Sequence, residues 1–418
     1  MDYVIQKAEL SKEVVIFFRR INFFANKKNK ISLSGCIFHV CLTGILLCSY
    51  ADAEGLSYGR FLLTPQLTLE EEYSDNVFEK TEDTKSDSST IISPVLSGYY
   101  AIGEDNRLGA HYNGEFSFYS TYDNLNRTDN KGAIDWWMRM PAGSTFSLGA
   151  NVLDSTIQPD EEYLPEDPDR EESKEKPYLL KSAFAEANLK PGEFTEVGFK
   201  YTFTSRKFDE SDYEEDDYDR HLFILDYVNR YFPRFPFLLE YRYSTNDRYD
   251  PDQDSTYNAI YVGARWTPET RLSGNLRVGY QQTDYEGIQD VDSFVVDTTL
   301  SYKLTDMTTA DLIVNRKLVD SETVENETGN NYTFMTWGGR LRYRYSEALD
   351  FSLLLRYLDK SYDNGRNDEI YNTRFTLNYE LNRWVAFSMG YRYTQRDSTE
   401  EGREYKVNSG IAGVTLSM

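Results

Sequence analysis

Regular alternation between apolar and polar side chains limits most strongly what this chain can fold into. In the segment 371–382, Tyr371 and Phe375 fall on one face of an extended strand, whereas Arg374 and Glu380 fall on the other. Many other segments repeat this period of two, and several place arginine between tyrosines, as in EYRYS, LRYRY and GYRYT. Such a period predicts β-strands with one apolar and one charged face.

The links between these segments alternate in length from residue 59 to the end of the chain. Short links such as GEDN, PAGS and TPET alternate with long acidic ones such as QPDEEYLPEDPDREESKEK. A soluble secreted β-protein also alternates, but its links need not sort by length, whereas those of a transmembrane barrel do. We predict an all-β fold, a transmembrane antiparallel β-barrel of about 18 strands (roughly 16–18), with short periplasmic turns and longer acidic extracellular loops.

The two faces of these strands need different surroundings. An arginine on the lipid face of a barrel costs about 2–4 kcal/mol near the bilayer midplane. We therefore expect Tyr391 and Tyr393 to face lipid, where aromatic belts lie, and Arg392 to face a wet interior. The last segment, 404–418, alternates less regularly, and we expect a change of phase at a β-bulge near Gly410.

The N-terminal part of the chain has the layout of a secretory signal. Basic side chains gather between residues 19 and 30, an apolar stretch runs from 31 to 50, and Ala51-Asp52-Ala53 fits a small-x-small cleavage site. A single membrane anchor is the alternative to a cleaved signal. The predicted organisation is an N-terminal extension plus signal peptide at 1–53 and an outer-membrane β-barrel at 54–418.

Little in the sequence points to bond-making chemistry. Cys36, Cys41 and Cys48 all lie in the predicted signal region, so no disulfide is expected in the barrel. His111 and His221 have no serine or aspartate partner in a recognisable motif, and we interpret both as polar residues of the lumen or rim. The acidic links lack the glycine and spacing of a calcium loop. We expect no enzyme activity, no cofactor and no metal site.

The charge of the predicted inner face differs from that of the whole chain. The net charge is −24, which argues against nucleic acid as a partner. Even so, the alternation of inward and outward positions along each strand assigns mainly basic side chains to the lumen. Two interpretations fit these side chains: Arg–Glu ladders that satisfy one another, or a path for an anionic or neutral glycan. The predicted lumen-lining residues are Lys200, Glu240, Arg242, Arg277, Arg340, Arg342, Arg344, Arg356, Arg374, Glu380 and Arg392.

The stretch LTPQLTLEEEYSDNVF at 63–78 resembles the first strand of a family of Gram-negative outer-membrane barrels, the putative β-barrel porin type 2 family. The repeated GYRY-type strands are similar to that family as well. The resemblance implies a place in the cell outer membrane, with lipid and the barrel assembly machinery as partners. It also implies an association with exopolysaccharide export. The chain departs from many outer-membrane barrels in ending at Met418 and not at an aromatic residue.

Taken together, these features predict a porin or channel for a hydrophilic solute. The resemblance favours support of exopolysaccharide secretion, with periplasmic polysaccharide-export proteins as partners. A general or anion-preferring diffusion porin is one alternative, and a closed structural or adhesive surface barrel is another.

Cleavage of the predicted signal can be checked directly. Intact-mass measurement of the protein purified from outer membranes should give a chain that starts at Glu54, because the small-x-small site ends at Ala53. A purified chain that retains residues 31–50 would show that this segment stays as an anchor.

Overall fold

The computed structural model describes most of the predicted barrel. The predicted signal region, residues 1–53, and much of the longest acidic link lie outside the described residues. Residues 51–418 form one compact unit, which is described here by itself. The described residues are 55–157, 176–209, 217–232, 234–249, 254–267, 271–286, 290–320, 331–362 and 365–418.

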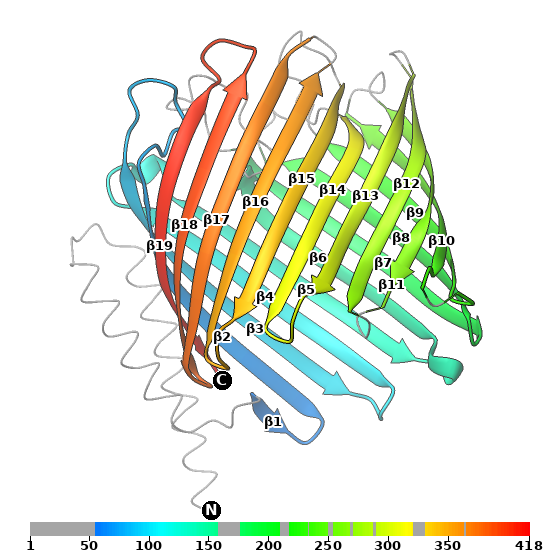
Figure 1. The fold of residues 1–418 in the computed structure, drawn as a ribbon. Helices are drawn as coiled ribbons and strands as arrows, with labels where there is room; N and C mark the ends of the chain where they lie inside the picture. The colour runs from blue at the N-terminus through cyan, green and yellow to red at the C-terminus, as the bar shows by residue number, and fades with distance from the viewer. Residues whose placement is uncertain are drawn as a thin grey trace, which may run out of the picture. The chain divides into compact units, whose positions relative to one another are not determined.

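The described chain folds into a closed antiparallel barrel of 18 strands, β2 to β19 (Figure 1). Each strand pairs with the next, and β19 returns to pair with β2 from Ser409↔Ser74 to Ser417↔Gln66. The predicted fold class is therefore confirmed. The strands are β2 (Phe61–Ser74), β3 (Asp87–Ala101), β4 (Asn106–Tyr119), β5 (Arg127–Arg139), β6 (Thr145–Ile157), β7 (Lys176–Gly192), β8 (Thr195–Phe208), β9 (Tyr218–Asn229), β10 (Phe237–Arg248), β11 (Ser255–Trp266), β12 (Leu272–Tyr285), β13 (Val291–Lys303), β14 (Thr308–Asp320), β15 (Asn331–Arg344), β16 (Leu349–Tyr362), β17 (Asn367–Asn382), β18 (Val385–Ser398) and β19 (Tyr405–Ser417).

Short connections join the strands at one end of the barrel, which we call the turn end; the longer links join them at the other, the loop end. The single-turn 3-10 helix η1 (Asp123–Leu125) lies in a link of the loop end, and a second, η2 (Pro141–Gly143), lies in a connection of the turn end. Among the described residues, no helix is long and apolar enough to cross a membrane. The connections at the turn end are 102–105, 140–144, 193–194, 230–236, 267–271, 304–307, 345–348 and 383–384.

Large apolar side chains occupy the outer face of the barrel. On β10, for example, Leu239 is 43% exposed and Tyr241 is 41% exposed, whereas Glu240 between them is 2% exposed. Toward the loop end, outward tyrosines meet polar side chains of the next strand: the Tyr241 hydroxyl donates to Asn258 at 2.8 Å. Tyr391 likewise donates to Asn408 at 2.6 Å. This belt of tyrosines marks the expected boundary between lipid and water.

The residues that carry the family resemblance organise the first long link. The Asn76 amide donates to Lys80 O at 2.8 Å and to Lys406 O at 3.1 Å. Phe78 is buried and packs edge-on against Tyr122, with ring centroids 4.8 Å apart. Because Lys406 lies on β19, the DNVF sequence fastens the link after β2 to the strand that closes the barrel.

Two features differ from the sequence-based expectations. Pairing runs without a register shift through Gly410, so the predicted bulge there is wrong. Ser409 faces the interior, and Val407 and Ile411 lie on the same face. Apolar side chains therefore occur on both faces of β19, which makes the alternation in the sequence irregular. A short strand that was not predicted, β1 (Leu56–Tyr58), pairs with β2 at Phe61–Leu63, beyond the end of β19.

A buried ion cluster ties β16, β17 and β18 together near the loop end. Asp368 is completely buried and accepts hydrogen bonds from Arg366 at 2.6 Å, from Arg396 at 2.7 Å and from Ser398 at 2.6 Å. Arg366 also stacks its guanidinium over the Tyr362 ring, 4.3 Å from the centroid. The single carboxylate therefore compensates two buried guanidiniums.

Replacement of that carboxylate should weaken the barrel. Asp368→Asn removes the carboxylate that both buried guanidiniums share and leaves Arg366 only its longer contact to Glu400 as an ion pair among the described residues, so we expect the free energy of unfolding to fall by about 3–5 kcal/mol. Urea unfolding in lipid vesicles measures this quantity. Asp397→Asn is the matched control, because that side chain is exposed and bonds only to Gln395. Equal stability of the two variants would contradict a stabilising role for the cluster.

Candidate functional site on the inner wall

Side chains alternate between the two faces of each strand. Every predicted lumen residue falls on the inner wall, the face opposite the exposed apolar side chains. Phe199, Tyr379 and Leu381 are large exposed apolar side chains. Lys200 follows Phe199 in the sequence, and Glu380 lies between Tyr379 and Leu381, so both point to the opposite face. Whether a solute touches these residues stays a prediction. The remaining nine occupy equivalent positions on their strands: Glu240 and Arg242 on β10, Arg277 on β12, Arg340, Arg342 and Arg344 on β15, Arg356 on β16, Arg374 on β17 and Arg392 on β18.

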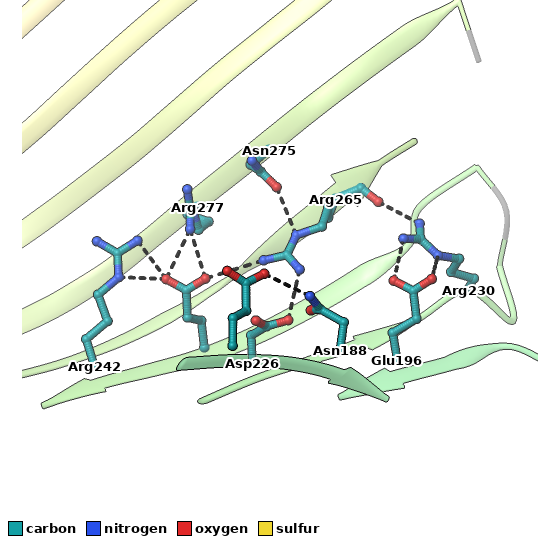
Figure 2. Close-up of polar contacts among 10 residues, drawn as sticks. Asn188, Glu196, Asp226, Arg230, Arg242, Arg265, Asn275 and Arg277 are labelled. Atoms are coloured by element: carbon teal, nitrogen blue, oxygen red, sulfur yellow. Dashed lines mark hydrogen bonds and ion pairs between the residues drawn. The ribbon is translucent and has the colours of Figure 1, made fainter. Parts of the chain in front are cut away.

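Three of these residues belong to an ion network centred on Glu240. Figure 2 shows its arginines Arg242, Arg265 and Arg277. The Glu240 carboxylate lies 2.7 Å from Arg242, 2.8 Å from Arg277 and 3.5 Å from Arg265. Arg277 and Glu240 are on strands separated by β11, so their side chains meet over the inner face of that strand. These contacts fit the interpretation in which arginine and glutamate satisfy each other.

The network continues around the wall on both sides of Glu240. Arg265 donates to Asp226 on β9 at 2.8 Å and to Asn275 on β12 at 3.1 Å. At the turn end, Arg230 binds Glu196 at 2.8 Å. The paired network thus contains as many arginines as carboxylates, and this half of the wall is close to neutral. Its members are Glu196, Asp226, Arg230, Glu240, Arg242, Arg265, Arg277 and Asp297.

A second group of arginines lies on β15 to β18 and has a different balance. Arg340, Leu354, Arg374 and Arg392 are successive partners across these strands, so three guanidiniums share one row of the wall. Arg374 and Arg392 are directly opposite each other, an arrangement that repulsion between like charges makes costly. We call the group the arginine face: Arg340, Arg342, Arg344, Arg356, Arg374 and Arg392.

Two members of the arginine face form ion pairs with carboxylates of nearby strands. Arg342 binds Asp311 on β14 at 2.8 Å, and Arg392 binds Glu72 on β2. Among the described residues, the guanidiniums of Arg340 and Arg344 have neither an ion pair nor a hydrogen bond. The Arg342 side chain is 51% exposed despite its ion pair. This half of the wall therefore presents accessible positive charge.

The inner wall is more covered toward the loop end than toward the turn end. Thr283 and Val295, at the loop ends of β12 and β13, are almost completely buried. Pairing between β13 and β14 stops at Val296↔Arg316, although both strands continue toward the loops. The inward Gln281 of β12 then donates to Leu318 O of β14 at 3.3 Å. The end of β14 therefore leans over the inner face of β13.

The structure gives the two histidines different places and supplies partners that the sequence motifs did not. His111 faces the interior and bonds to Ser97 at 3.0 Å and to Asp135 at 2.9 Å. His221 lies on the outer face and shares a hydrogen bond with Tyr201 at 2.8 Å. Among the described residues, no cluster of acidic, histidine or cysteine side chains could hold a metal ion.

Residues 239–418 match the family model described as Putative beta-barrel porin 2. The predicted resemblance is confirmed over this part of the chain, which holds β11 to β19 and most of β10. The stretch 63–78, on which the resemblance was first noted, lies outside the matched residues. No curated protein sequence matches the chain.

Solved structures of Pseudomonas porins have a similar arrangement of strands. The outer-membrane protein OpdK of Pseudomonas aeruginosa is 12% identical, with a TM-score of 0.48 over 85% of this chain and 99% of that one. OccK2 (OpdF) of the same organism, solved with glucuronate, is 11% identical, with a TM-score of 0.47 over 85% and 98%. A BenF-like porin of Pseudomonas fluorescens Pf-5 is 11% identical, with a TM-score of 0.46 over 85% and 99%.

The closed barrel, its apolar outer belt and the family match agree with one another. Together they support the predicted outer-membrane β-barrel, and the predicted localisation in the outer membrane is confirmed.

Removal of accessible arginines should change which ions the barrel passes. For Arg340→Gln with Arg374→Gln, we expect the ratio of chloride to potassium permeability to fall at least about twofold, because rings of basic side chains favour anions. Reversal potentials in a planar bilayer under a salt gradient give this ratio. The control is Arg242→Gln with Asp297→Asn, which removes one charge of each sign from the paired network. Similar ratios in both double variants would mean that the arginine face does not line the ion path.

Proposed function

We propose that the barrel is a channel for an anionic hydrophilic solute and that it supports secretion of an exopolysaccharide across the outer membrane. The uneven charge of the inner wall carries the proposal. One half of the wall is neutralised by the paired network, whereas on β15 the guanidiniums of Arg340 and Arg344 have neither an ion pair nor a hydrogen bond among the described residues, and Arg342 is half exposed. An anionic glycan offers carboxylates at regular spacing, and arginine binds carboxylates through two parallel hydrogen bonds.

The arrangement of the arginine face suits a chain-like solute. Arg340, Arg374 and Arg392 follow one another around the wall, and Arg342 and Arg344 continue along β15 toward the turn end. A polymer that enters at the turn end, expected to face the periplasm, would meet guanidiniums in succession. Periplasmic polysaccharide-export proteins would then act at this end. The glycan cargo itself is favoured by the family resemblance.

A closed structural or adhesive barrel is the second candidate. It is favoured by the burial of Val295 and Thr283 at the loop end and by the end of β14 that leans over β13. A closed barrel would not conduct, whereas both a glycan channel and a general diffusion porin would.

Current block by an acidic polysaccharide separates these functions. With purified protein in a planar bilayer, oligogalacturonate added at the turn end should interrupt the current, and dextran of equal length should do so much less often. In Arg340→Gln with Arg374→Gln, the frequency of block should fall at least about tenfold, as expected for the loss of charge-assisted hydrogen bonds. Anion-selective current without glycan block would identify a diffusion porin. A barrel that stays silent would identify the closed structural form.

The role in secretion can be tested in the producing cell. Deletion of the gene should lower the polysaccharide at the cell surface and cause polymer to accumulate in the periplasm. The wild-type chain should restore export, whereas Arg340→Gln with Arg374→Gln should restore little, and the charge-balanced control variant should restore it fully. Unchanged surface polysaccharide after deletion would contradict the secretion role and leave the channel proposal to be judged on its currents.

A further inference from the structure

Three inward side chains on neighbouring strands form a hydrogen-bonded chain that the channel function does not use. Ser97 Oγ on β3 lies 3.0 Å from His111 Nδ1 on β4, and His111 Nε2 lies 2.9 Å from Asp135 Oδ1 on β5. Ser97 and His111 are direct partners across the two strands. The three residues lie on β3 to β5, whereas the arginine face lies on β15 to β18.

The partners fix which atoms carry protons. A carboxylate only accepts hydrogen bonds, so the His111 Nε2 must carry a hydrogen that it donates to Asp135. In the neutral ring, Nδ1 then has the free lone pair and accepts from the Ser97 hydroxyl. This is the arrangement of nucleophile, base and orienting acid found in serine hydrolases, with the two ring nitrogens exchanged.

The surrounding positions leave room for this arrangement. A Cβ at Gly109 would lie 2.2 Å from Asp135 Oδ1 and 2.9 Å from His111 Nε2, so a larger residue there would force both groups apart. The Tyr99 ring meets the imidazole edge-on at 5.2 Å and limits its rotation. The imidazole is therefore held between its two partners.

The chain of hydrogen bonds is also open to the lumen. The side chains of His111 and Asp135 are 24% and 25% exposed, and Ser97 is half-buried. The next row of the inner face toward the loop end holds Gln66 and Asn113, both partners of Val95. Their amide groups are donors that could stabilise a negative oxygen beside Ser97.

We propose that Ser97 is a nucleophile toward acyl esters that enter the lumen. Ser97 Oγ attacks the ester carbonyl carbon as its proton passes to His111 Nδ1, and the C–O bond to the leaving alcohol breaks as His111 returns that proton to the alcohol oxygen. Water then attacks the acyl-Ser97 ester, again through His111, and releases the carboxylic acid and free Ser97. Asp135 holds the imidazole and stabilises its protonated form. The reaction needs no redox partner.

A fluorophosphonate probe tests for the nucleophile. On protein purified from outer membranes, peptide mass spectrometry should find the label at Ser97, and hydrolysis of p-nitrophenyl acetate should fall at least about tenfold in Ser97→Ala and His111→Asn. Ser155→Ala is the matched control, because Ser155 is also an inward serine bonded to a carboxylate, Asp129, but lacks a histidine. Absence of label at Ser97, or hydrolysis unchanged in Ser97→Ala, would overturn the proposal.

A second measurement separates activation by the histidine from mere exposure. The sequence has no cysteine after Cys48, so a thiol introduced at position 97 or 155 gives an unambiguous signal in the barrel. Ser97→Cys should be alkylated by iodoacetamide near neutral pH at least about tenfold faster than Ser97→Cys with His111→Asn, whereas addition of His111→Asn to the more buried Ser155→Cys should leave its rate unchanged. Equal rates for Ser97→Cys with and without His111→Asn would show that His111 does not activate position 97.

Discussion

The fold depends on one requirement, that every backbone N–H and C=O within the bilayer find a partner in the chain itself. An open sheet leaves two edges unpaired in lipid, which costs several kcal/mol for each exposed group, so the sheet must close. In this molecule the closing contact is the pairing of β19 with β2, and the link after β2 is fastened to the same seam through Asn76 and Lys406. The residues that carry the family resemblance therefore serve the one contact that makes a barrel possible.

Closure in lipid also decides where charge can lie. Side chains on the outer face must be apolar near the midplane, so charged strand residues at that depth are confined to the interior. Within that space, charges either neutralise one another, as around Glu240, or remain accessible, as on β15 to β18. The two halves of the wall therefore differ: one holds a nearly closed set of ion pairs, and the other holds guanidiniums that stay accessible.

The period of two and the sorted links were enough to predict the fold, because both follow directly from the geometry of a barrel. The odd and even positions of each strand also gave the prediction that Arg340, Arg374 and Arg392 line the lumen. This alternation could not bring Arg277 to Glu240, because that contact crosses an intervening strand and depends on register and curvature. Nor could it join Ser97, His111 and Asp135, which lie on three strands and meet only once two turns have fixed their alignment. The irregular alternation around Gly410 did not mark a bulge, because the inner wall holds apolar side chains as well as charged ones.

The seam between β2 and β19 has a consequence for how the molecule is made. It joins residues as far apart as Thr68 and Thr415, 347 positions along the chain, whereas every other seam joins neighbours in sequence. Until the last strand is in place, β2 and β18 both present open edges, each able to recruit a strand from another chain. Loop closure over such a span is slow as well as late. The time between completion of β18 and docking of β19 is therefore the interval in which this protein is most exposed to misassembly, and a host factor that holds both edges would act there.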